Sequence, residues 1–149
     1  MKQIIITFLI LALSVTSFAQ SNDVNAVKAV LKKYATSIEK LDTTGITNLF
    51  VKNASVYEGG SIEGTIVNYL EHHLGPELKE FKSFNFSDYN IAVTVTGDYA
   101  FTTETYIYTI VLAKDNKEFK SKGVATSILK KMKEGWKIVS THSSFRKVK

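Results

Sequence analysis

The feature that most constrains this fold is a change in the spacing of apolar residues after Ser83. Before this point, apolar side chains recur every three or four residues, which is typical of amphipathic helices. After it they alternate with polar side chains, which is typical of strands with one buried face. The alternating segments cover residues 84–96, 99–112, 119–132 and 136–147. Helices followed by four strands joined through short turns predict an α+β fold with an antiparallel meander.

The helical part begins with a long amphipathic segment over residues 22–41. Its apolar residues recur at helical spacing, and the polar run 21–23 before it can cap a helix N-terminus. Asp42-Thr43-Thr44 is expected to end this helix and to cap a shorter one that runs through Phe50. The sequence therefore predicts one long helix followed by one short helix.

The middle of the chain mixes strand, turn and helix signals. Residues 53–57 alternate enough to form a short strand, and Gly59-Gly60 predicts a tight turn after it. Residues 65–74 carry a broad apolar stripe at helical spacing. Gly75 suits the position just past the end of that helix, and the proline that follows suits the first turn of another, over residues 76–81.

Long strands twist, and a sheet built from them curls. We expect the helices to cover the concave side of a strongly curved, mixed or antiparallel sheet. Such an arrangement forms a cone-shaped α+β barrel with an internal pocket. A chain of 149 residues is long enough for one domain with one core, which we place at residues 20–149.

The N-terminus has the pattern of a secretory signal peptide over residues 1–19. Lys2 precedes an apolar run over residues 4–13, and Ser17-Phe18-Ala19 fits the small-x-small cleavage pattern. The run is about half of the roughly 20 residues that a membrane-spanning helix needs. These features predict cleavage after Ala19, a periplasmic or secreted protein, and no stable membrane anchor. The alternative is an uncleaved signal anchor, which an intact mass including residues 1–19 would reveal.

Composition excludes several classes of function. The chain has no cysteine, so it has no disulfide, no cysteine nucleophile and no thiolate metal site. Its net charge of +5 comes from scattered lysines. A nucleic-acid interface requires a concentrated basic face with interleaved aromatic residues, and we therefore expect no nucleic-acid partner.

Three stretches carry a resemblance to a known superfamily. The first is the opening amphipathic helix with Leu41-Asp42 and the short helix to Phe50. The second is the pair of closing strands, VATSIL at 124–129 and EGWKIVSTHSS at 134–144. The third is Tyr57-Glu58-Gly59-Gly60 with the later Tyr69, His72-His73 and Pro76-Glu77. Together they resemble the nuclear transport factor 2-like superfamily, which includes SnoaL-like and ketosteroid isomerase-like proteins, and in particular a subgroup of small exported bacterial proteins.

The resemblance implies a conical fold over nearly all of residues 20–149 and a homodimer formed through the sheet. It leaves the function open, because the superfamily includes isomerases, hydro-lyases, cyclases and non-catalytic binding domains. True ketosteroid isomerases use an aspartate base and an oxyanion hole made of an acid and a tyrosine. No motif of this chain places Glu58, Tyr69 and Glu104 in those roles, so steroid isomerisation is not assigned.

The segment 57–81 concentrates the residue types that carry chemistry. Tyr69, His72 and His73 share part of one helical face, and His73 is the better candidate for a pocket because it follows the Tyr69 stripe. We expect Gly75-Pro76 to break the helix before Glu77, so that Glu77 lies in the first turn of the next helix. Histidines in the last turn of a helix also have a purely structural use, since a cation there complements the helix dipole.

The last strand supplies a second histidine. Regular alternation places Trp136, Ile138, Ser140, His142 and Ser144 on one face, which we expect to lie over the pocket. His142 would then lie at the wider end of that pocket. A histidine that is merely hydrogen-bonded to neighbouring serine or threonine side chains is the alternative.

Two chemistries fit these residues. His73 and His142 with Glu58 and Glu77 have the donors for a divalent-metal site, although their spacing matches no known metal motif and no cofactor is assigned. The other chemistry is metal-free acid–base catalysis by His73, His142 and Glu58. Glu104 is expected to form an exposed cross-strand salt bridge. The residues expected to contact a ligand are Tyr69, His72, Glu77, Trp136 and Tyr106. Tyr69, Tyr106 or Tyr108 is expected to donate to a developing oxyanion.

The sequence therefore leads to two hypotheses about function. The first is an exported domain that binds a small, largely apolar molecule and acts on it as a lyase or isomerase. The second is a non-catalytic ligand-binding or interaction module, in which the histidines are structural or bind a divalent metal.

Overall fold

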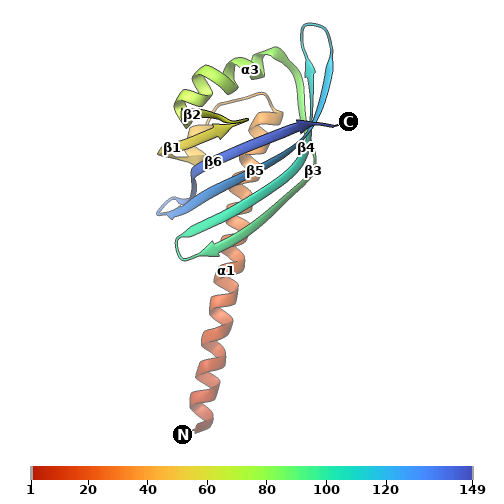
Figure 1. The fold of residues 1–149 in the computed structure, drawn as a ribbon. Helices are drawn as coiled ribbons and strands as arrows, with labels where there is room; N and C mark the ends of the chain where they lie inside the picture. Colours follow the sequence, from red (N-terminus) through yellow and green to blue (C-terminus); the bar gives the residue numbers. More distant parts are fainter. Residues whose placement is uncertain (1, 149) are drawn as a thin grey trace.

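The computed structural model describes the backbone of residues 2–148 and the side chains of residues 21–148. A six-stranded sheet curves around a long helix (Figure 1). The elements in order are α1 (Lys2–Glu39), the 3₁₀ turn η1 (Ile46–Leu49), β1 (Phe50–Glu58), β2 (Ser61–Thr65), α2 (Ile66–Tyr69), the π-helical turn η2 (Leu70–Leu74), α3 (Gly75–Glu80), β3 (Phe81–Thr96), β4 (Tyr99–Leu112), β5 (Glu118–Met132) and β6 (Gly135–Lys147).

The sheet is mixed, with the strand order β2-β1-β6-β5-β4-β3. β3 to β6 form the predicted antiparallel meander, and the bounds of β4 match the prediction at both ends. β1 pairs with β6 in the parallel direction, and β2 pairs with β1 as an antiparallel edge. The predicted α+β fold with a strongly curved mixed sheet is confirmed. β2 was not predicted, because SIEGT has neither an apolar alternation nor a buried residue.

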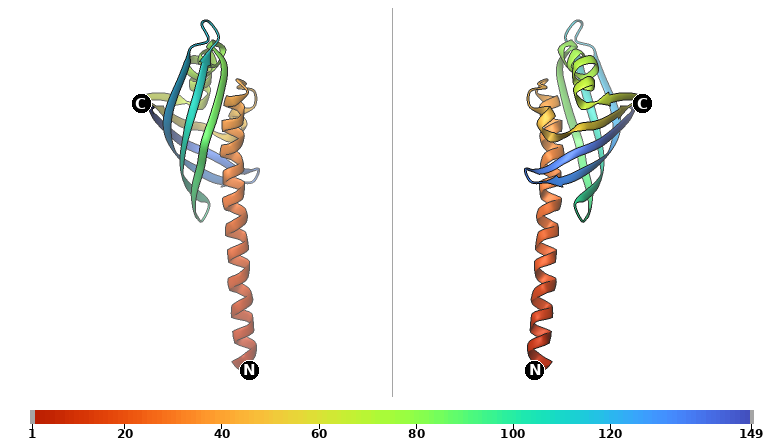
Figure 2. Two further views of the ribbon diagram at one scale, coloured as in Figure 1. Left: turned by 90° about the vertical axis from the view of Figure 1, so that its right-hand side faces the viewer. Right: turned by 90° about the vertical axis from the view of Figure 1, so that its left-hand side faces the viewer.

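The helix α1 packs against β3 and β6 on the concave side of the sheet. Val27 and Leu31 are fully buried there, as their helical spacing predicts. The predicted helix start at residues 21–23 is wrong: the backbone is helical from Lys2, since the preceding apolar run continues the helix. Figures 1 and 2 show this N-terminal half extending beyond the sheet. The side chains around the predicted cleavage site lie outside the described ones, and among the described residues no helix could span a membrane.

Asp23 does not cap the helix but links α1 to the sheet through an ion pair and a hydrogen bond. Its carboxylate lies 2.7 Å from the ammonium nitrogen of Lys131 and accepts a hydrogen bond from Nε1 of Trp136 at 3.1 Å. The Lys131 hydrogen bond holds the pKa of Asp23 below its ordinary value. Trp136 is 5% exposed and is not among the described residues that line the cavity on the concave side of the sheet, which corrects its expected contact with a ligand.

The predicted helix break at Gly75-Pro76 is also wrong. Gly75 has helical angles (φ −62°, ψ −47°), and its N–H donates to the Leu70 carbonyl five residues earlier, which is the hydrogen bond of a π turn. The π turn brings the Leu70 carbonyl so close that a Cβ on Gly75 would lie 2.3 Å from it. Pro76 fits directly afterwards, in the first turn of α3. Helical backbone therefore continues from Ile66 to Glu80.

A β-bulge in β6 reverses which face of the sheet each side chain points to in the part of the strand after Val139. Leu129 of β5 pairs with Ile138, but the preceding residue of β5 pairs with Ser140. Val139 is therefore the extra residue of the bulge and has no partner on β5. Beyond the bulge, Thr141 and Ser143 face the concave side, and His142 faces the other side. The predicted inward orientation of His142 is wrong for this reason, since a one-residue shift exchanges the two faces of a strand.

Candidate functional site

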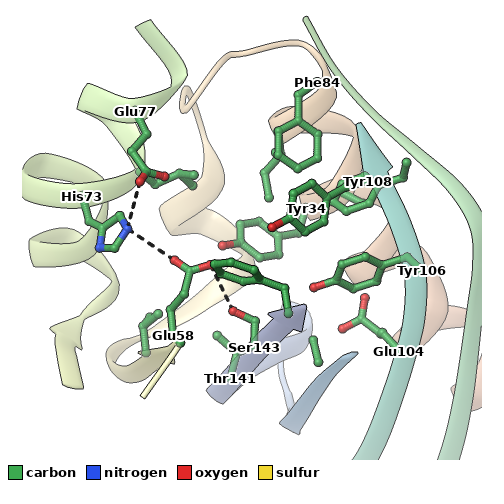
Figure 3. A pocket seen from close by; sticks show the side chains of 18 of the residues that line it. Tyr34, Glu58, His73, Glu77, Phe84, Glu104, Tyr106, Tyr108, Thr141 and Ser143 are labelled. Atoms are coloured by element: carbon green, nitrogen blue, oxygen red, sulfur yellow. Dashed lines mark hydrogen bonds and ion pairs between the residues drawn. The ribbon is translucent and has the colours of Figure 1, made fainter. Parts of the chain in front are cut away.

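A cavity of about 460 Å³ lies between α1, the helical backbone from Ile66 to Glu80, and the concave face of the sheet. Figure 3 shows polar groups on opposite walls of this cavity. Many of its lining residues are aromatic, as in many small-molecule sites. The aromatic lining residues are Tyr34, Tyr69, Phe81, Phe84, Phe86, Tyr89, Tyr106, Tyr108 and Phe145.

Glu58, at the end of β1, is the centre of a hydrogen-bond network on one wall. Its Oε2 accepts from the Tyr69 hydroxyl at 2.7 Å, and its Oε1 accepts from the Ser143 hydroxyl at 3.2 Å. The turn at Gly59-Gly60 directly after it places Glu58 at the strand end, and both glycines have positive φ as predicted. The bulge in β6 is what brings Ser143, rather than His142, to this carboxylate.

His73 lies in η2 among three carboxylates. Its Nδ1 is 2.9 Å from Oε2 of Glu63, and a carboxylate only accepts, so Nδ1 carries a hydrogen. Its Nε2 lies 3.6 Å from Glu58 and 3.4 Å from Glu77 (Figure 3). His73 and Glu77 can contact each other because the helical backbone is continuous between them, and residues four apart lie on one face of a helix. Glu63 was missed by the sequence analysis, because it lies on the unpredicted strand β2.

These contacts shift the protonation of His73 and Glu77. Burial lowers the pKa of His73, but the Glu63 hydrogen bond and the charges of Glu77, Glu58 and Glu63 outweigh burial, so the pKa is raised above its ordinary value. Burial raises the pKa of Glu77, and the neighbouring His73 partly opposes that effect. His73 is therefore favoured as a cation, which agrees with a role as proton donor.

Glu63→Gln is expected to lower the pKa of His73, because it removes the charged hydrogen-bond partner of Nδ1. NMR titration of the ring protons measures this pKa. A raised native pKa stabilises the fold fully below the unfolded value of about 6.5, and this stability is lost as pH rises through the native pKa. The variant should thus lose stability mainly at acidic pH. Glu71→Gln, at an exposed carboxylate, is the control, and an unchanged His73 titration in Glu63→Gln would contradict the assignment.

Glu104, on β4, lies on the opposite wall of the cavity. It is 7% exposed, accepts a short hydrogen bond from the Tyr89 hydroxyl, and points toward the cavity beside Tyr106 (Figure 3). Burial raises the pKa of Glu104, and the Tyr89 hydrogen bond partly opposes this. The predicted exposed salt bridge of Glu104 is therefore wrong. A bulge at Asp88, where φ is +51°, turns Tyr89 inward to meet it.

Tyr106 lies beside Glu104 on the same wall (Figure 3). Gly123 on the neighbouring strand leaves room for its ring, since a Cβ there would lie 2.1 Å from ring atom Cε2. Burial, and secondarily the charge of Glu104, raises the pKa of Tyr106, so its hydroxyl stays protonated. Tyr69, Tyr106 and Tyr108 all line the cavity.

Two of the predicted site histidines lie outside the cavity. His142 lies beside Tyr57 in a shallow groove on the other face of the sheet. His72 is exposed and lies 4.0 Å from Glu71. Glu58, His73 and Glu77 thus come together as expected, but without either of these histidines. Within residues 21–148, no group of three or more histidine or acidic side chains has the arrangement of a metal site.

The other face of the sheet exposes several large apolar side chains, among them Ile62, Phe101, Val124 and Ile128. Such a surface is compatible with the homodimer that the resemblance implies. The dimer remains a prediction.

Comparisons with known proteins agree with this fold. A family model described as a SnoaL-like domain matches residues 27–146. A nuclear transport factor 2-like superfamily protein from Salmonella enterica has a TM-score of 0.74 at 21% identity, covering 90% of this chain and 94% of its own. None of the curated proteins matches the sequence significantly.

Two further solved structures carry functional descriptions. A candidate ketosteroid isomerase from Shewanella frigidimarina has a TM-score of 0.67 at 26% identity, covering 80% of this chain and 94% of its own. A candidate scytalone dehydratase from Novosphingobium aromaticivorans has a TM-score of 0.72 at 15% identity, covering 89% of each chain. The superfamily predicted from the sequence is thereby confirmed.

Proposed function

Because the chain belongs to the SnoaL-like domain family, we propose that its cavity binds a small, largely apolar molecule and acts on it by acid–base chemistry. The reaction class is that of a lyase or an isomerase, which the descriptions of two structural neighbours support. Export through a cleaved signal peptide is part of the same proposal.

The observation that carries the proposal is the placement of proton-handling groups on two opposite walls of one cavity (Figure 3). Glu58 and His73 occupy one wall, and Glu104 and Tyr106 occupy the other. The pKa values of His73, Glu104 and Tyr106 are raised above their ordinary values, and shifted groups that face one cavity are typical of acid–base sites. Aromatic side chains such as Phe84 and Phe86 line the same cavity.

Each group has a distinct role in this proposal. Glu58 is the general base and removes a proton from a carbon next to a carbonyl group of the ligand. The Tyr106 hydroxyl donates to the carbonyl oxygen as negative charge develops there. His73, held as a cation, donates a proton to a departing hydroxyl group in a lyase reaction, so that water leaves. In an isomerase reaction, the proton taken by Glu58 returns to a different carbon.

Glu58→Gln tests this function, because glutamine keeps the shape but cannot take a proton. We expect kcat to fall by about 10²–10⁴-fold on any substrate that the protein turns over. A panel of β-hydroxy ketones and β,γ-unsaturated ketones is suitable, since dehydration or isomerisation yields a conjugated product with strong ultraviolet absorbance. His142→Gln is the control and should leave kcat within about twofold, as His142 lies outside the cavity. Full activity in Glu58→Gln would contradict the assigned base.

One observation favours the second candidate, a non-catalytic binding module. Both oxygens of Glu58 already accept hydrogen bonds from the protein, and Oε2 also lies near His73. A carboxylate held in this way also serves to fix the cavity wall. Recovery of an unchanged small molecule by native mass spectrometry, with no turnover of the panel, would favour the binding module.

A further inference from the structure

The charges around the cavity are unbalanced. Its lining includes the carboxylates of Glu58, Glu77 and Glu104, and His73 is the only basic side chain among the described lining residues. No lysine or arginine of that lining opposes them, although the whole chain carries a net charge of +5. The basic residues of this protein are therefore elsewhere, and the space inside is acidic. An anionic ligand would meet like charge there, which disfavours binding.

Glu104 is a buried carboxylate with one oxygen that accepts no hydrogen bond from the described residues. It is 7% exposed, and its Oε2 accepts from Tyr89. Its Oε1 has no hydrogen-bond partner among the described residues, and the carboxylate points toward the cavity (Figure 3). Glu58 differs, because both of its oxygens are engaged within the protein. A buried carboxylate without a counter-charge is costly, and burial raises the pKa of Glu104 accordingly.

Several aromatic rings line the same cavity as Glu104. Tyr106 packs edge to face with Phe86, with ring centroids 5.0 Å apart, and Tyr89 stacks on Phe86 at 5.6 Å. Phe84 stacks on Tyr108 at 5.4 Å. Aromatic faces attract an organic cation within about 6 Å, and desolvated sites strengthen this attraction. Aromatic rings and a buried carboxylate with a free oxygen together favour one class of ligand.

We infer that the cavity takes a small organic cation, in which a protonated amine is attached to an apolar body. The ammonium group donates to Oε1 of Glu104, and the apolar body lies against the aromatic wall that includes Phe84 and Phe86. Glu77, at the mouth of the cavity, adds a second favourable charge. This inference rests on the proposed function only in taking the cavity as the ligand site.

Three ligands of similar size test the inference: 2-phenylethylamine, 2-phenylethanol and phenylacetate. Isothermal titration calorimetry at pH 7 with the purified protein measures Kd for each. We expect the amine to bind at least about tenfold more tightly than the alcohol, because its charged group forms the stronger hydrogen bond to a carboxylate. Phenylacetate should bind more weakly than either.

Two variants test whether the preference for the amine over the alcohol depends on Glu104. Glu104→Gln should bring the Kd of the amine to within about twofold of that of the alcohol, whereas Glu71→Gln removes the same charge from an exposed position and should leave the preference intact. If Glu104→Gln fails to fold, Glu77→Gln provides a milder test and should raise the Kd of the amine by about threefold. Its side chain is about half exposed, so folding should tolerate the change.

The outcomes separate this inference from the proposed function. If the alcohol or phenylacetate binds as tightly as the amine, the ligand class is wrong while the cavity remains a binding site. If the amine is preferred equally in wild type and Glu104→Gln, the assigned contact is wrong. If none of the three ligands binds, the ligand class is contradicted, whereas the proposed function is tested separately by turnover of the ketone panel.

Discussion

Ile138→Ala is expected to lower the free energy of unfolding by about 2–5 kcal/mol. Ile138 is fully buried on the inner face of β6, and its partner Leu129 on β5 is fully buried as well. Truncation removes buried methyl and methylene groups and leaves a cavity that close-packed neighbours cannot fully close. Urea denaturation followed by circular dichroism measures the loss, provided that the transition remains two-state.

His142→Ala is the matched control on the same strand. Regular alternation through β6 would place both side chains on one face, but the bulge at Val139 exposes His142 on the other side. We expect a change within about 0.5 kcal/mol for this variant. A loss comparable to that of Ile138→Ala would mean that the strand has no bulge and that His142 faces inward.

Gly75→Ala should destabilise the protein by about 1–3 kcal/mol, although alanine is ordinarily the better helix former by about 1 kcal/mol. The added Cβ would lie 2.3 Å from the Leu70 carbonyl oxygen, so the backbone of the π turn must move. Movement of this turn displaces His73 from Glu58 and Glu63. Two measurements should therefore change together: the midpoint of urea denaturation and the NMR titration of His73.

A substitution at an exposed position nearby separates these effects from general changes in helix stability. Glu71→Ala lies in the same π turn with an exposed side chain and should change stability by less than about 0.5 kcal/mol. An increase in stability for Gly75→Ala would show that the segment is an ordinary α-helix with a regular hydrogen-bond pattern.

The meander was predictable from the sequence, because alternation with period two persists through each strand and turn residues separate them. The long helix was predictable as well, since Val27, Leu31 and Ala35 recur at helical spacing and are buried. The start of this helix was not predictable, because the residues before Asp23 also favour a helix and continue it.

The candidate site was predictable only in part. Glu58, Tyr69, His73 and Glu77 lie close together in the sequence, and turns and helices keep them close in space. His142 was misplaced because a bulge leaves no signal in an alternating pattern. The π turn likewise reads as a helix end, since Gly75-Pro76 is the usual pair for stopping a helix.

The opposite wall was the least predictable part. Sequence alternation shows which residues share a face with Glu104, but it does not show how deep that face lies. The hydrogen bond from Tyr89 depends on a second bulge, at Asp88, whose positive φ has no clear signature in a strand. The burial of Glu104 and the bulge at Asp88 both depend on how the whole chain packs. Together they determine the protonation of Glu104 and its hydrogen bond.

The bulge at Val139 also determines where β6 can change in length. Val139 has no counterpart on β5, so a chain lacking it would return to regular pairing with Ile138 and Thr141 still on the inner face. Loss of one residue closer to the end of the strand would turn over every side chain beyond it. Homologous sequences can therefore differ by a gap at this position and still present the same hydroxyl groups to Glu58.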